Sequence, residues 1–218
     1  MSSRKIKIMF DASFIDLDST IYETNRLVEA MRKIFLDAGV SDDDFEESKD
    51  KAICPKDNYF DYTFENQFFN LREKGYALPD DVIQKLHDLL KVNYVASGAK
   101  DLLEFLKDNS NKMILLSGGN SDFQRKKLIS SGLENFFNEI HFVHGNKEEI
   151  VRQKIGAGKS LFVNDSLREN FIISKSFPNV VVLSRVNPMK PRTDYLNSGL
   201  PFFENLIDIQ KYVEQQIQ

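Results

Sequence analysis

The chain has 218 residues, enough for one domain with a sizeable buried core and a modest insertion. Its 29 Lys and Arg against 33 Asp and Glu give a formal net charge of −4, which argues against a general binder of nucleic acid or anionic membranes. The single cysteine, Cys54, excludes an internal disulfide, and neither a secretory signal nor an apolar run of membrane-spanning length is present. We therefore expect a cytoplasmic globular protein that is a monomer or a weak homodimer.

The first hundred residues are predicted to be mainly helical. An apolar strand ends at Ile15, and apolar residues recur at helical spacing from Leu27 to Ala38. A second helix is predicted over 79–91, where proline occupies the first position. The charged and aromatic stretch 41–62 has no assigned elements. Because no strand pattern occurs over 27–93, this part is predicted to be a helical insertion.

Short apolar runs alternate with amphipathic segments in the rest of the chain. The runs predict strands over 113–116, 140–143, 160–163 and 180–183. The segments predict helices over 124–131, 147–155 and 205–215, and two prolines predict an exposed loop over 187–191. Continuous apolar strands are typical of parallel sheets buried on both faces.

The predicted fold class is therefore α/β. We expect a Rossmann-like parallel sheet flanked by helices and a small all-helical domain. The predicted boundaries are 1–24 and 95–218 for the α/β core and 25–94 for the helical domain.

Two carboxylates, Asp16 and Asp18, follow the first apolar strand. The carboxyl ends of parallel strands are where open α/β folds bind ligands. Paired carboxylates at such an edge can hold a hard cation or divide nucleophile and acid/base roles between them. The pair alone is a weak signal, because a capped turn after a strand has the same composition.

Further polar residues follow the other predicted strands. Ser117 and Gly118 end the strand over 113–116, and a hydroxyl beside free backbone N–H groups can bind a phosphate. Asp165 follows the strand over 160–163, with Glu169 one helical turn later. Lys147 precedes that strand. An acid pair, a hydroxyl with glycines, a lysine and another acid in this order are much less easily accidental than any one of them.

With these residues the chain resembles the haloacid dehalogenase superfamily of phosphohydrolases. The first motif of that family, Asp-x-Asp-x-Thr, matches residues 16–20, and its second, a Ser or Thr at a strand end, matches Ser117. Its lysine matches Lys147, and its last acidic motif matches Asp165 and Glu169. The helical insertion then resembles the family's cap.

The resemblance implies a two-step phosphoryl transfer. Asp16 would be the nucleophile that forms an aspartyl-phosphate, and Asp18 would be the general acid and then the general base. Ser117, Gly118 and Lys147 would bind the phosphoryl oxygens.

The resemblance also implies a Mg²⁺ cofactor. Its ligands would be the Asp16 carboxylate, the backbone carbonyl of Asp18 and Asp165, with Glu169 holding a metal-bound water. The substrate would be a small-molecule phosphate monoester.

The sequence departs from the family pattern at three positions. Ser19 and Asn164 stand where glycine is usual, and Glu169 stands where aspartate is usual. Asn164 is expected to tolerate a left-handed backbone. Lys126 and Lys127 compete with Lys147 for the lysine role, but we expect both on the solvated face of their helix.

Alternative functions differ in the residues that they would require. A haloacid dehalogenase would not need Asp18, and a P-loop kinase would need a Walker motif that is missing. A phosphosugar mutase would keep every motif, and a binding protein without activity could keep the fold. Arg72 and Asn66 are candidates for polar substrate contacts, whereas the aromatic residues around them are expected mostly to pack in a core: Tyr59, Phe60, Tyr62, Phe64, Phe68 and Phe69.

Overall fold

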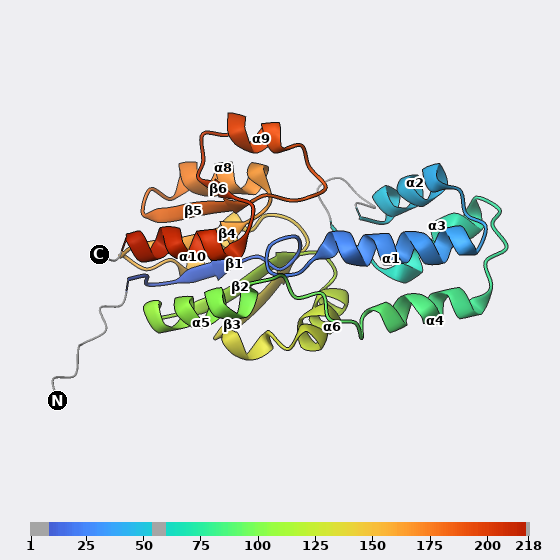
Figure 1. The fold of residues 1–218 in the computed structure, drawn as a ribbon, viewed down its shortest axis with the longest axis horizontal. Coiled ribbons are helices and arrows are strands. Elements are labelled where there is room, and N and C mark those ends of the chain that lie inside the picture. The colour runs from blue at the N-terminus through green and yellow to red at the C-terminus, as the bar shows by residue number, and fades with distance from the viewer. Residues whose placement is uncertain (1–8, 54–59, 217–218) are drawn as a thin grey trace.

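The protein is built around one parallel sheet, as seen in a computed structural model that describes residues 9–53 and 60–216 (Figure 1). Six strands lie in the order β3-β2-β1-β4-β5-β6. Their bounds are β1 (Ser13–Ile15), β2 (Met113–Gly118), β3 (Glu139–Val143), β4 (Ser160–Asn164), β5 (Val180–Arg185) and β6 (Phe202–Phe203). The short β1 is central, because its three residues pair with both β2 and β4.

Helices cover both faces of the sheet. Alternate strand residues point to opposite faces, so Ile15 packs in one core and Phe14 in another. The first core includes α5 (Ala99–Asn109) and α10 (Leu206–Gln215), and the second includes α7 (Glu148–Lys154) and α8 (Leu167–Ser176). This arrangement confirms the predicted α/β class with a parallel sheet flanked by helices.

The remaining elements of the second half connect the strands. They are α6 (Ser121–Ser131), a 3-10 helix (Glu134–Phe136) and α9 (Arg192–Asn197). Asn120 caps the start of α6, because its side-chain oxygen accepts hydrogen bonds from the N–H groups of residues 122 and 123.

Within residues 9–53 and 60–216, every helix is too short or too polar to traverse a bilayer.

In the described part of the chain, four helices between β1 and α5 extend beyond the carboxyl edge of the sheet (Figure 1). They are α1 (Thr24–Asp37), α2 (Asp42–Ile53), α3 (Phe64–Glu73) and α4 (Asp80–Leu89). In α1, Leu27, Met31 and Phe35 recur every four residues and are all buried, as the spacing predicted. Helix α4 begins one residue later than predicted, because the ψ of 151° at Pro79 is extended and makes this proline the cap.

Helix α2 lies in the stretch 41–62, for which no elements are predicted. Of the predicted aromatic core residues, Phe64 and Phe68 are buried, whereas Phe60 and Phe69 are exposed. Tyr62 is partly buried against the core. Cys54 and Tyr59 lie outside the described residues.

The chain enters and leaves the four helices at one place. The Glu23 N–H donates to the Tyr94 carbonyl at 2.7 Å, and the Ala96 N–H donates to the Ile21 carbonyl at 3.0 Å. The rings of Tyr22 and Tyr94 pack with centroids 5.6 Å apart. The two connections between α1–α4 and the sheet are therefore bonded to each other.

Candidate active site

The predicted site residues gather at the carboxyl edge of the sheet. Asp16 and Asp165 directly follow β1 and β4, and Ser117 lies near the end of β2. These three strands are neighbours in the parallel sheet, so the topology brings their carboxyl ends together. They line one cavity of about 650 Å³, between the sheet edge and α1–α2. All seven residues expected from the sequence line it: Asp16, Asp18, Ser117, Gly118, Lys147, Asp165 and Glu169.

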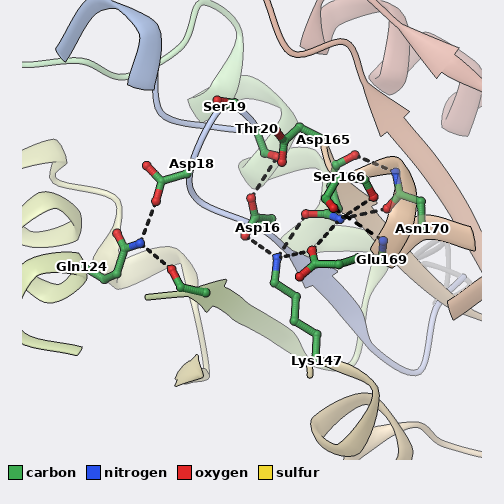
Figure 2. A network of polar contacts seen from close by, with 12 residues as sticks. Asp16, Asp18, Ser19, Thr20, Gln124, Lys147, Asp165, Ser166, Glu169 and Asn170 are labelled. Carbon is green, nitrogen blue, oxygen red and sulfur yellow. Dashed lines mark hydrogen bonds and ion pairs between the residues drawn. The ribbon is translucent and has the colours of Figure 1, made fainter. Parts of the chain in front are cut away.

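Lys147 joins the acidic residues of this edge (Figure 2). Its ammonium group donates to Asp16 Oδ1 at 2.7 Å and to Asn164 Oδ1 at 3.1 Å, and it lies 2.9 Å from Glu169 Oε2. These three acceptors match the three N–H donors of a lysine. The side chain is only 4% exposed, so Lys147 is a buried bridge between carboxylates.

Burial and crowding raise the pKa of two carboxyl groups. Burial raises the pKa of Asp16 to about 6, with contributions from the charges of Glu169 and Asp18, while Lys147 acts in the opposite direction. Burial and then the charge of Asp16 raise the pKa of Asp165 to about 7. Neighbouring buried acids therefore compete for ionisation near neutral pH.

Asp165 is held by the segment that follows β5. Asn187 Nδ2 donates to Asp165 Oδ2 at 2.7 Å, and the Tyr195 hydroxyl donates to the Asp165 carbonyl at 2.9 Å. The sequence predicted an exposed loop over 187–191, which is wrong for Asn187. This residue is buried because its amide reaches back to the sheet edge, while the four residues after it are exposed.

The Asp18 side chain makes separate contacts from those of Asp16 (Figure 2). It accepts hydrogen bonds from Thr24 Oγ1 at 2.6 Å and Gln124 Nε2 at 2.7 Å, and it pairs with the ammonium group of Lys127. Burial alone would raise the pKa of Asp18, but Lys127 and these hydrogen bonds outweigh it and lower the pKa. In this position Asp18 is ionised at neutral pH.

Lys127 corrects the prediction that Lys126 and Lys127 both lie on a solvated face. Lys126 is exposed, but Lys127 is buried, with its ammonium group 5.0 Å from the centroid of the Tyr22 ring. The signal was present in the sequence, since Lys127 lies one helical turn after Phe123, which is also buried. Sequence reasoning likewise missed Thr24 and Gln124.

The two positions where glycine is usual behave differently. Ser19 has a φ of 54° and is the one non-glycine residue with a positive φ in the described chain, which accounts for the family's preference there. Asn164, which was expected only to tolerate a left-handed backbone, does not have a positive φ. Its buried side chain instead donates to Glu169 Oε2 and to Asn170 Oδ1, both at 3.0 Å.

Ser117 carries a buried hydroxyl at the end of β2. It is 1% exposed, and its Oγ has no hydrogen-bond partner among the described residues. An unpaired buried hydroxyl costs free energy, on the order of 1–3 kcal/mol, unless a ligand or water satisfies it. Because Ser117 lines the same cavity as Asp16, its hydroxyl is available to a ligand beside that carboxylate.

The acidic edge fits a hard cation. No group of three or more His, Cys, Asp or Glu side chains is arranged to hold a metal in the part of the chain that the structure describes. Two carboxylates with raised pKa values, Asp16 and Asp165, nevertheless lie close enough to interact, and a divalent cation would relieve their repulsion. The carboxylates of Asp18 and Glu169 are engaged by Lys127 and Lys147.

Comparison with known sequences identifies the family. The profile described as haloacid dehalogenase-like hydrolase matches residues 14–168, which span the strand before Asp16 through Asp165. The chain belongs to this family. No curated protein matches the sequence significantly.

Solved structures of this family share the fold across nearly the whole chain. YfnB from Bacillus subtilis, a provisionally assigned hydrolase solved bound to magnesium, is 19% identical with a TM-score of 0.64, covering 94% of this chain and 98% of its own. A provisionally assigned beta-phosphoglucomutase from Thermotoga maritima is 15% identical with a TM-score of 0.67, at 94% and 99% coverage. L-2-haloacid dehalogenase from Xanthobacter autotrophicus is 16% identical with a TM-score of 0.63, at 94% and 99% coverage. At these identities the likeness concerns the fold alone.

Proposed function

We propose that this hydrolase is a Mg²⁺-dependent phosphatase that cleaves a small-molecule phosphate monoester through an aspartyl-phosphate. The observation that carries the proposal is the buried, unpartnered hydroxyl of Ser117 in the cavity that Asp16 lines. A phosphoryl oxygen would satisfy that hydroxyl and place phosphorus beside a carboxylate nucleophile. The second carboxylate, Asp18, also supports phosphoryl chemistry, since a dehalogenase would not need it.

In the first step an Asp16 oxygen bonds to phosphorus as the bond to the leaving oxygen breaks. Asp18 gives a proton to that oxygen, and the alcohol departs. Lys147 orients Asp16 through the contact of 2.7 Å and offsets negative charge beside the phosphoryl group. Asp18 must be protonated for this step, so it has to separate from Lys127.

In the second step a water oxygen attacks phosphorus and the bond to Asp16 breaks. Asp18 accepts the water proton, which frees inorganic phosphate and restores both carboxyl groups. Asp16, the Asp18 carbonyl and Asp165 would hold Mg²⁺, with Glu169 nearby. When bound, Mg²⁺ neutralises charge on the phosphoryl oxygens and on these carboxylates.

Helices α1–α4 are proposed to be a cap that closes over the site. Leu27 and Met31 of α1 line the same cavity as Asp16, which supports a role for this part in enclosing the substrate. A closed cap would exclude bulk water while the alcohol leaves.

Phosphate release tests the proposal. Wild-type protein is incubated with p-nitrophenyl phosphate and a panel of metabolite phosphates, with Mg²⁺ and then with EDTA. We expect release that EDTA abolishes and that Asp16→Asn lowers by at least about 10³-fold, because the variant removes the nucleophile with little change in volume. Circular dichroism of the variant checks that the fold is retained.

Two other results would contradict the proposal. Wild-type turnover in Asp16→Asn would exclude this nucleophile. No release from any ester by folded protein that binds Mg²⁺ would favour a mutase, which transfers phosphate between sugar positions, or a binding role.

A further inference from the structure

The cavity beside Asp16 has two unlike walls. Charged side chains line the wall at the sheet edge, whereas the facing wall carries mainly apolar groups from α1, α2, α6 and the segment before α3. We call the second the apolar wall, and its residues are Leu27, Val28, Met31, Ile53, Tyr62 and Phe123. Apolar lining favours an apolar part of a ligand, because both surfaces leave water on binding.

The polar groups of Tyr62 and Lys49, on and beside the apolar wall, are already bonded to protein. The Tyr62 hydroxyl donates to Gln67 Oε1 at 2.7 Å, and the ammonium group of Lys49 pairs with Glu46. Beside Asp18, Gln124 Oε1 is buried without a partner among the described residues and can accept one hydrogen bond. A sugar or another polyol would bring several hydroxyl groups to this surface.

The two polar candidates predicted in this part of the sequence are also engaged. Arg72 Nη2 donates to the Leu78 carbonyl at 2.8 Å, and Asn66 Nδ2 donates to the Asp61 carbonyl at 3.1 Å. Neither residue lines the cavity. They therefore do not convert the apolar wall into a polar binding surface.

The apolar wall lies where a leaving group would extend. In an in-line displacement the nucleophile and the leaving oxygen are on opposite sides of phosphorus. With Asp16 at the sheet edge, the leaving group points away from that edge and toward α1 and α2.

We infer that the leaving group of the substrate is an apolar alcohol rather than a sugar or another polyol. This inference rests on the proposed phosphatase function and names its substrate class. The reason is desolvation: hydroxyl groups buried against the apolar wall lose their hydrogen bonds to water without replacement, whereas methylene groups gain contact.

The test compares two six-carbon esters of a primary alcohol, n-hexyl phosphate and sorbitol 6-phosphate. Their phosphate groups are the same, and the hydroxyl groups of sorbitol make it the better leaving group in solution. We expect kcat/KM for hexyl phosphate to exceed that for sorbitol 6-phosphate by at least about tenfold. p-Nitrophenyl phosphate serves as a reactive reference for the phosphatase itself.

A matched pair of variants links the preference to the apolar wall. Val28→Thr keeps the shape of the side chain and adds a hydroxyl to the wall, so the hexyl-to-sorbitol ratio should fall by about threefold to tenfold. Val92→Thr makes the same change at an exposed position outside the cavity, and the ratio should stay at its wild-type value.

The outcomes separate the two proposals. Equal or better turnover of sorbitol 6-phosphate by an active enzyme overturns the inference and leaves the phosphatase function intact. A ratio that falls equally in both variants also overturns it. No release from either ester or from p-nitrophenyl phosphate overturns the phosphatase function, and the inference with it.

Discussion

At the scale of single residues, two buried lysines divide the acids of the site between them. Lys147 binds Asp16 and Glu169, whereas Lys127 binds Asp18 from another helix. Each lysine is almost fully covered, so its charge acts through protein rather than through water. The proposed nucleophile and the proposed acid/base therefore have separate cations that can be altered one at a time.

Replacing Lys127 should change how Asp18 titrates. In Lys127→Met the burial that raises the pKa of Asp18 remains while the opposing cation is lost, so the pKa rises. We expect the alkaline limb of the kcat/KM profile to move upward, because the first step needs protonated Asp18. We also expect kcat at neutral pH to fall roughly tenfold, because the second step needs ionised Asp18. The pH dependence of phosphate release measures both.

Its neighbour provides the control. Lys126→Met removes the same charge from an exposed position of α6 and should keep the wild-type profile. Lys127→Arg should restore part of the activity by keeping a cation. A profile unchanged in Lys127→Met would mean that this lysine does not set the acidity of Asp18.

The raised pKa values of Asp16 and Asp165 predict how pH and Mg²⁺ affect stability. A carboxyl group whose pKa is higher in the folded protein than in the unfolded chain makes the folded state bind protons more tightly. Its contribution to stability is therefore lost as pH rises, here from about 4 toward 6–7. Above pH 7 both groups are mostly ionised, which is the form of a carboxyl group that binds a cation.

We thus expect Mg²⁺ to raise Tm by several degrees at pH 8 and by much less at pH 5, where protons occupy the carboxyl groups. Differential scanning calorimetry at both values of pH, with and without Mg²⁺, measures this. Asp165→Asn should reduce the Mg²⁺ effect at pH 8. An equal shift at both values of pH would contradict a metal site built on these two acids.

At the scale of elements, the turn from β2 into α6 positions Asp18 indirectly. Gly119 has a φ of +118°, and a Cβ added there would lie 2.9 Å from Gln124 Nε2. That amide group donates to Asp18 and to the Gly118 carbonyl. The glycine is therefore required both by the backbone conformation and by the space that Gln124 occupies.

Two glycine substitutions, one before α6 and one after it, distinguish the effect of backbone strain on stability from the effect of Gln124 on kcat. Gly119→Ala should destabilise the protein by about 1–3 kcal/mol and lower kcat roughly tenfold, because it displaces Gln124. Gly132→Ala, at a φ of +67° with open space around it, should cost about 1 kcal/mol and leave kcat unchanged. Urea denaturation and steady-state rates measure the two effects, and equal kcat values would contradict the role of Gln124.

Some elements were predictable and others were not, for physical reasons. The buried strands β2 and β4 appear as apolar runs in the sequence. Because the strands are parallel neighbours of β1, the polar residues at their carboxyl ends lie at the same edge of the sheet. The partners of a buried polar side chain depend on tertiary packing, which a local pattern does not contain. Two contacts of this kind occur in the site. Asn164 joins Lys147 to Glu169, and Lys127 pairs with Asp18.

At the scale of the whole molecule, a second contact region ties α1–α4 to the sheet domain. The Phe60 N–H donates to the His144 carbonyl at 2.8 Å, and Asn120 Nδ2 donates to Asp61 Oδ1 at 2.9 Å. These bonds join the segment before α3 to the loops after β3 and β2. If α1–α4 act as a cap, they stabilise its closed position.

Removing one of these ties should favour an open arrangement. Asp61→Ala loses the acceptor for Asn120, so we expect a larger radius of gyration in solution and a KM raised about threefold to tenfold. Small-angle X-ray scattering and steady-state kinetics measure these changes. Asp80→Ala, which removes an exposed carboxylate within the helices, is the control. Identical scattering for both variants would argue against a hinged cap.

The close approach of Glu23 to Tyr94, where the chain enters and leaves the four helices, has an evolutionary consequence. A segment whose two ends lie next to each other can be replaced without changing the order of the strands. The reason is that the rest of the fold only has to connect two neighbouring positions. Exchange at these two positions would bring new side chains to the cavity while leaving the residues of the sheet edge unchanged. Replacement of this one inserted segment is therefore a route by which related proteins acquire different substrates.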